Sequence, residues 1–358
     1  MAGTMQELGA AAYRSDPGPG HAGPPEPAPP DPGPAAHGRP DARWSDAGPP
    51  WRGSFTPYSV GDPGRAATLT VPSSDRACWD RPDTVLDAVV VAGPGGRPVA
   101  DLRAASVRGL SHRHYAKVRQ DEYAFRTTAD GRNLVVAVAD GVSEGRLSHL
   151  AAKLAVRHGA DLLCSRLTRA APEYLDWGVV LADVASIIEN VGRRQLAHDG
   201  VPDAGLATVR DVADHLATTI LYAVVDLEGA ADGLPVHLLS YGDTSAWILD
   251  VDGSWWPQQP VKNEGAQIHS SAVAALPVLT GAPPAPVRTT VRPGEALVLM
   301  TDGVGDPLAG GTGLVGRFLA EAWRRPPADL EFAAQVGFAR KTYDDDRTAV
   351  AIWPAARP

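Results

Sequence analysis

Two strongly apolar runs of the sequence each end directly at an Asp-Gly pair. The run 134–139 precedes Asp140, the run 297–301 precedes Asp302, and a glycine follows each aspartate. Short apolar runs of this kind are typical of buried strands, so we expect each carboxylate at the mouth of a strand. The glycine permits a tight turn and lets a backbone carbonyl approach a ligand. The two runs therefore predict a sheet core whose edge presents acidic groups.

Two further acidic segments lie next to predicted strands. Asp121 precedes one strand, and Asp344, Asp345 and Asp346 precede the last strand of the chain. If these strand ends converged without a partner, their negative charges would repel one another. A divalent cation with oxygen ligands would turn that repulsion into binding. The pattern is therefore compatible with a site for divalent metal ions.

A simpler interpretation exists for each aspartate taken alone. Asp-Gly at the end of a strand is common turn chemistry. Adjacent aspartates such as Asp344, Asp345 and Asp346 are usually solvated or cap a helix. The metal interpretation depends on all the aspartates meeting in space, which spacing along the chain does not reveal.

The chain divides into two parts by composition. Fourteen of its 33 prolines lie between Pro17 and Pro63, among many Gly and Ala and few aliphatic residues. Such a segment buries too little apolar surface to offset the entropy of ordering it. We predict a disordered or extended arm over residues 1–80, with Tyr58 and other scattered aromatics either docked or isolated. Residues 81–358 are enough for one large core.

Hydrophobic periodicity and turn residues predict the elements of this second part. Strands are predicted at 85–91, 104–108, 122–127, 134–139, 217–225, 236–241, 245–249, 297–300 and 348–353. Helices are predicted at 147–167, 175–196, 318–323 and 330–339, with an irregular excursion over 251–290. This order predicts an α+β fold in which helices cover antiparallel sheets.

Charge, cysteine content and hydropathy exclude several classes of protein. The net charge of −9 and the spread of acidic residues argue against nucleic-acid binding, which needs a basic face. Cys78 and Cys164 stand alone, so neither a disulfide framework nor a thiolate zinc site is expected. The sequence shows neither a secretory signal nor an apolar run long enough to cross a bilayer. These features predict a cytoplasmic protein that acts without a membrane.

Six motifs, taken in order, resemble those of the type 2C metal-dependent protein serine/threonine phosphatases, especially a bacterial branch. They lie at 106–123, 138–142, 216–220, 241–246, 300–304 and 344–350. The resemblance implies a four-layer α/β/β/α sandwich over residues 81–358. It also implies a phosphoric monoester hydrolase acting on phosphorylated proteins, in which a water activated by two metal ions attacks phosphoserine or phosphothreonine.

The resemblance also implies roles for single residues. Asp140 would bridge two Mn²⁺ or Mg²⁺ ions, with a third ion left open, and the carbonyl of Gly141 would face one of them. Asp302 and Asp345 would complete the other ion's ligands, and Asp121 would orient metal-bound waters. Manganese and magnesium both suit an all-oxygen ligand set.

The sequence departs from the family pattern near the expected phosphate. Gln120 stands where many members have Glu, and Val142 stands where some members have a candidate acid, His. No arginine matches the phosphate-binding position cleanly. Arg119 is our candidate because a planar fork suits phosphate, with Arg113 and Lys117 as alternatives and a solvated surface role equally compatible.

Some polar residues near these motifs receive structural interpretations. His112 and His114 are read as structural because a lone histidine is more often structural than a ligand. Asp243 is assigned to a turn between strands. Asp346 occupies a position that is often Asn in the family, so it ranks below Asp345 as a ligand.

Two other functions remain open from the sequence. A non-catalytic phosphatase-like module that binds phosphoproteins would fit Gln120 and Val142, although the retained aspartates argue against it. Another two-metal hydrolase, such as a nuclease, is disfavoured by the acidic balance. Hydrolysis of p-nitrophenyl phosphate that depends on metal and on Asp302 would distinguish these functions.

Overall fold

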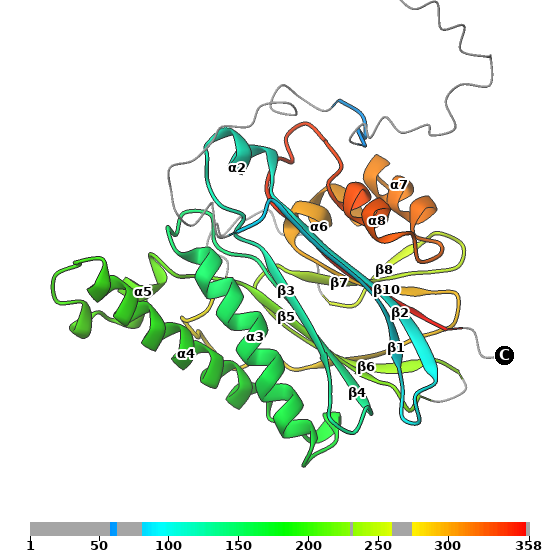
Figure 1. Cartoon of the computed structure of the whole chain (residues 1–358), viewed down its shortest axis with the longest axis horizontal. Helices are drawn as coiled ribbons and strands as arrows, with labels where there is room; N and C mark the ends of the chain where they lie inside the picture. The colour runs from blue at the N-terminus through cyan, green and yellow to red at the C-terminus, as the bar shows by residue number, and fades with distance from the viewer. Residues whose placement is uncertain (1–57, 63–80, 230–231, 260–273, 356–358) are drawn as a thin grey trace, which may run out of the picture. The chain divides into compact units, whose positions relative to one another are not determined.

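The computed structural model describes residues 58–62, 81–229, 232–259 and 274–355. The predicted disorder of the arm concerns residues 1–57 and 63–80, which lie outside these ranges. Within them the chain forms helices and two sheets (Figure 1).

Both sheets of the described residues are antiparallel. The six-stranded sheet has the order β1-β2-β11-β10-β7-β8, and the five-stranded sheet has the order β3-β4-β5-β6-β9. The first contains β1 (Thr84–Ala92), β2 (Pro98–Val107), β7 (Ser245–Leu249), β8 (Trp255–Pro257), β10 (Ala296–Met300) and β11 (Arg347–Pro354). The second contains β3 (Glu122–Thr127), β4 (Asn133–Ala139), β5 (Ile220–Asp226), β6 (Leu234–Tyr241) and β9 (Val287–Val291).

Helices cover the outer face of each sheet (Figure 1). On the five-stranded sheet these are α3 (Ser148–Leu167) and α4 (Trp177–His198), with the short α5 (Val209–Ala213) beside α4. On the six-stranded sheet they are α6 (Asp302–Leu308), α7 (Leu314–Ala322) and α8 (Asp329–Val336). None of the helices in the described ranges combines the length and the apolar character needed to span a membrane.

The alternation of side chains along β4 explains the layers. Val135 and Ala137 pack into the cluster that α3 and α4 share, whereas Val136 and Val138 pack between the two sheets. Successive side chains of a strand point to opposite faces, so a wholly apolar strand must be covered on both sides. The predicted four-layer sandwich of two antiparallel sheets flanked by helices is confirmed.

The structure differs from the predicted elements in several places, and the short helices α2 (Leu110–His114) and α5 were not predicted. The segment 251–290 contains the short edge strands β8 and β9 besides loops, and its part 260–273 lies outside the described residues. Strand β2 begins at Pro98 rather than at 104, because it pairs along its length with β1 and β11. Helix α6 was not predicted, since Gly303, Gly305 and Pro307 hide its seven residues.

One described piece of the predicted arm contacts the sandwich. The ring of Tyr58 lies 5.3 Å from that of Phe318, centroid to centroid. The amide of Val60 donates to the carbonyl of Ala339 (3.0 Å), and Arg340 donates to the carbonyl of Val60 (3.0 Å). Of the two possibilities for this aromatic, docking is therefore the one observed.

Candidate metal centre

The fold brings Asp140, Asp302 and Asp345 to one cavity of about 590 Å³. Asp140 follows β4, Asp302 begins α6 just after β10, and Asp345 lies just before β11. Because β10 and β11 pair with Met300 opposite Ala349, the end of one strand lies beside the start of the other. Three carboxylates that are far apart in the sequence thus line the same cavity.

Burial and mutual repulsion raise the pKa values of two of these carboxyls, Asp140 and Asp302. The pKa of Asp140 lies well above its usual value because of burial and the charges of Asp121, Asp302 and Asp345. Burial also raises the pKa of Asp302 to about 6, although a hydrogen bond with Asp140 opposes the shift. Asp243 lies in the β6–β7 turn, as the sequence predicts, but it also lines the cavity and its charge acts on Asp302. The cluster carries more negative charge than its surroundings compensate.

This set of donors fits divalent cations. Among the described residues that line the cavity there is no Lys, Arg or His. Hard cations such as Mg²⁺ and Mn²⁺ prefer carboxylate and carbonyl oxygens. An uncompensated group of carboxylates is stabilised when such an ion replaces the missing positive charge.

Asp121 lies behind the cavity and is only 1% exposed. The hydroxyl of Thr301 donates to its Oδ2 (2.7 Å) and accepts from the amide of Thr348 (3.0 Å). Burial, followed by the charge of Asp346, raises the pKa of Asp121 well above its usual value. Its position next to the cavity residues agrees with an outer role more than with direct contact to a ligand.

Gly141 occupies a place where backbones approach closely. A Cβ at this position would lie 2.9 Å from the carbonyl carbon of Ser148 and 3.0 Å from the carbonyl oxygen of Gln120. The amide of Thr219 (2.8 Å) and the hydroxyl of Thr218 (2.7 Å) both donate to the carbonyl of the preceding Asp140. These contacts fix the turn that carries Asp140.

Arg119 is not at the cavity. Its side chain is 2% exposed, and its guanidinium donates to the hydroxyl of Ser106 and to the carbonyls of Asp121 (2.6 Å) and Pro82 (3.3 Å). The alternatives Arg113 and Lys117 do not line the cavity either. The position of Arg119 therefore suits a residue that holds the backbone of Asp121, not one that binds phosphate.

Replacing Arg119 by Lys tests this assignment. Loss of buried hydrogen bonds is expected to lower the free energy of unfolding by about 1–3 kcal/mol. The KM of the variant for p-nitrophenyl phosphate should stay within about two-fold of the wild-type value, because Arg119 does not contact the substrate in this assignment. Urea unfolding and steady-state kinetics measure both quantities. A raised KM with unchanged stability would instead indicate phosphate binding.

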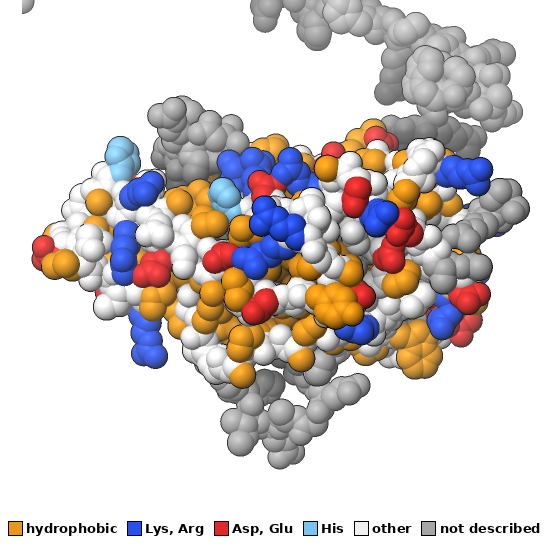
Figure 2. Space-filling model, turned by 90° about the horizontal axis from the view of Figure 1, so that it is seen from below, with side chains coloured by type: hydrophobic (Ala, Val, Ile, Leu, Met, Phe, Trp, Pro, Cys, Tyr) orange, Lys and Arg blue, Asp and Glu red, His pale blue; other side chains and the backbone are white. Residues whose placement is uncertain are grey.

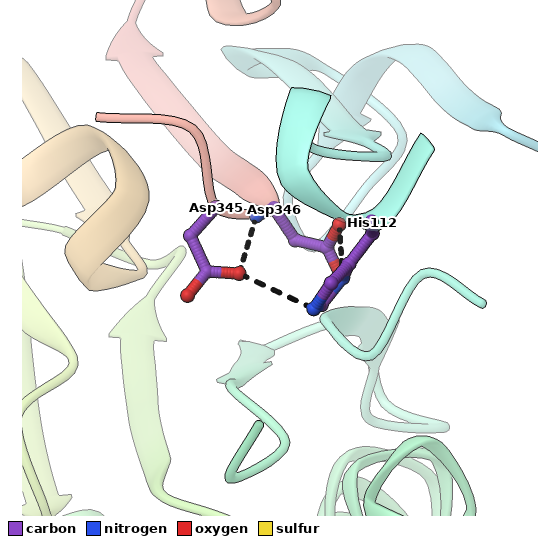
Figure 3. A group of neighbouring side chains, drawn as sticks. All are labelled: His112, Asp345 and Asp346. Carbon is purple, nitrogen blue, oxygen red and sulfur yellow. Dashed lines mark hydrogen bonds and ion pairs between the residues drawn. The ribbon is translucent and has the colours of Figure 1, made fainter. Parts of the chain in front are cut away.

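His112, which the sequence predicts to be structural, lies next to Asp345 and Asp346 (Figure 3). It lies on α2 (Leu110–His114) and is 3% exposed. Its Nδ1 lies 3.0 Å from Oδ1 of Asp346, and its Nε2 lies 3.7 Å from Oδ1 of Asp345. Although burial opposes it, Asp346 raises the pKa of His112 above its usual value.

Asp346 holds this arrangement together. Its carboxylate accepts from the amides of Gly109 (2.6 Å) and Gln120 (2.5 Å), and its own amide donates to Oδ1 of Asp345 (2.8 Å). Burial opposes the shift, but His112 and these amides lower the pKa of Asp346. Asp346 is thus a buried, fully engaged carboxylate, whereas Asp345 lines the cavity. One feature of the sequence pointed to this pair: Asp346 occupies a position that is often Asn in the family, and the additional buried charge requires a cationic partner.

Comparison with known proteins identifies the family of the chain. The profile described as Protein phosphatase 2C matches residues 108–332, more than half of the chain. No curated protein sequence matched the chain. Similar solved structures include the catalytic domain of the serine/threonine phosphatase PstP with two manganese ions (18% identity, TM-score 0.44, 72% of this chain and 99% of that one). RsbX in complex with magnesium is also similar (12% identity, TM-score 0.40, 76% of this chain and 100% of that one). So is PppA of Pseudomonas aeruginosa (15% identity, TM-score 0.43, 76% of this chain and 97% of that one). On the extent of the profile match, the chain belongs to the protein phosphatase 2C family.

Proposed function

We propose that this protein is a metal-dependent protein serine/threonine phosphatase. The observation that supports it most is the convergence of Asp140, Asp302 and Asp345 on one cavity without a Lys or Arg among its described lining residues. The raised pKa of Asp302, about 6, agrees with a site that lacks its positive partner.

Separate residues of the chain would hold the metal ions and orient water at the site. Asp140, the carbonyl of Gly141, Asp302 and Asp345 would hold two Mn²⁺ or Mg²⁺ ions. Bound divalent ions lower the pKa of a water molecule and neutralise phosphoryl oxygens. Asp121, held by the hydroxyl of Thr301, would orient water at the site.

The phosphoryl group would depend on these ions for its binding. The described cavity wall offers no basic side chain, and Arg119 is buried elsewhere. Val142, which lines the cavity, has no proton to give to the leaving oxygen. We therefore expect the serine or threonine oxygen to take its proton from water.

Phosphorylated proteins are the proposed substrates, and a cytoplasmic role in signalling remains a prediction. On the face shown in Figure 2, the basic and acidic side chains of the described residues are interspersed. Nucleic-acid binding usually requires basic residues gathered in a patch or stripe. This face agrees with a protein substrate.

Metal removal tests the proposed function. Chelation with EDTA is expected to lower hydrolysis of p-nitrophenyl phosphate and of a phosphothreonine peptide by at least about 100-fold, because the nucleophile and charge neutralisation both depend on the ions. Manganese added in excess should restore both activities. Turnover that survives chelation would contradict the proposal. A folded protein that binds manganese without turnover would point to a non-catalytic binding module.

A further inference from the structure

A second pair of acidic side chains lines the same cavity as Asp140. Glu144 lies in the loop between β4 and α3, and Asp214 caps the end of α5. Both side chains are exposed, and neither has a hydrogen bond or ion pair from its carboxylate within the described part of the chain. The cavity wall thus carries negative charge beyond the candidate metal ligands.

Backbone hydrogen bonds hold these two segments against each other. The amide of Val142 donates to the carbonyl of Ala217 (3.0 Å), and the amide of Leu147 donates to the carbonyl of His215 (2.8 Å). Gly145 supports this approach, because a Cβ there would lie 2.9 Å from the carbonyl oxygen of His215. The loop that carries Glu144 is therefore fixed to the segment that follows Asp214.

The rest of the wall is mostly apolar, with three hydroxyl side chains, those of Ser143, Thr219 and Thr280. Ala213, Ala217 and Val278 line the cavity between the acidic groups. Thr219 also lines it, is 3% exposed, and its hydroxyl has no hydrogen-bond partner within the described residues. A buried hydroxyl without a partner is costly, so it indicates that a ligand or water completes its hydrogen bonding.

This combination suits one kind of side chain. Lys and Arg carry an aliphatic stem that packs on apolar surface and a charged head that stays near water and carboxylates. An acidic neighbour of the phosphoresidue would meet only like charge on this wall. The cavity thus offers a stem surface beside Ala213 and Val278 and a charge partner at Glu144 and Asp214.

We propose that Glu144 and Asp214 determine specificity, so that this phosphatase prefers phosphorylated protein segments with Lys or Arg next to the phosphoresidue. The proposal rests on the proposed function for its reaction, but the preference itself is a property of the cavity wall. Exposed ion pairs are weak and screened by salt, so we expect a preference of about 3- to 10-fold at low salt.

Two phosphothreonine peptides that differ only in carrying Arg or Glu beside the phosphoresidue test this preference. The ratio of their kcat/KM values should be about 3 to 10 for the wild type and fall to about 1 for the variant Glu144→Gln/Asp214→Asn. Because the ratio is taken within each protein, a change in the chemical step cancels. Equal rates for both peptides in the wild type, or an unchanged ratio in the variant, would overturn the proposal.

A matched variant and a binding measurement complete the test. Glu321→Gln/Asp232→Asn removes the same charge from exposed positions that do not line the cavity, so the ratio should stay as in the wild type. Fluorescence anisotropy of the two labelled peptides in their unphosphorylated form reports the preference without turnover. If p-nitrophenyl phosphate is not hydrolysed, the proposed function fails, while anisotropy still decides the preference.

Discussion

Replacing Asp302 by Asn is expected to lower kcat/KM for p-nitrophenyl phosphate by at least about 100-fold, because a metal ligand is lost. The same variant should be more stable than the wild type when metal is removed at about pH 7, since one of several mutually repelling carboxylates becomes neutral. A residue that only supported the fold would lose stability and activity together. The opposite signs of the two effects are therefore diagnostic of a metal ligand.

The pH dependence of this stabilisation follows from the pKa of Asp302, which burial raises to about 6. An unfolded chain has an ordinary Asp pKa of about 3.9, so the folded metal-free protein binds the proton more tightly. The associated stability, on the order of 3 kcal/mol, is present below about pH 4 and is lost as the pH rises through about 6. The Asp302→Asn variant has no ionisable carboxyl at this position, so it does not lose this stability as the pH rises.

Thermal melts in EDTA from about pH 4 to about pH 8 measure the effect. The melting temperature of the Asp302→Asn variant minus that of the wild type should be near zero at the acidic end and positive at the neutral end. Glu321→Gln, which removes an exposed charge from α7, should show no such pH-dependent gain. A fully active Asp302→Asn enzyme would reject the role of this residue.

Removal of the His112 ring is expected to have the largest effect on stability. The variant His112→Ala leaves Asp346 buried without its cation, and breaking a buried ion pair typically costs about 3–5 kcal/mol. Asp346 donates through its amide to Asp345, so the disturbance should also reach the cavity. We expect a higher manganese concentration at half-maximal activity as well as a lower free energy of unfolding.

A double-mutant cycle separates the ion pair from simple loss of packing. In an Asp346→Asn background the charge is absent, so His112→Ala should cost at least about 1 kcal/mol less than in the wild type. His114→Ala, on the same short helix, has no ion pair with either aspartate and should leave the metal dependence unchanged. Additive costs for His112 and Asp346 would show that the two side chains do not interact.

Strong local patterns made much of the fold predictable from the sequence. The wholly apolar run of β4 is stable only as a strand that is buried on both faces. The long periodic segments of α3 and α4 are stable as helices that bury one face. The edge strands β8 and β9 lacked such a pattern, because a short edge strand gains most of its order from its neighbour.

The metal centre was less predictable than the fold, because its geometry depends on contacts between residues that are far apart in the sequence. The aspartates were found by their place at the ends of apolar strands, and that place follows from local sequence. Arg119 was misplaced because its burial depends on contacts with Ser106 and Pro82, which no spacing rule reveals. The contact of His112 with Asp346 was not predictable for the same reason, since the two residues lie more than two hundred positions apart.

A crystal of the wild-type protein soaked in manganese, with anomalous diffraction data, tests the central assignment most directly. We predict two anomalous peaks in the cavity, each about 2.0–2.6 Å from oxygens of Asp140, Asp302 or Asp345. Peaks located only elsewhere, or a cavity without any peak at saturating manganese, would contradict the assignment of these three carboxylates as metal ligands.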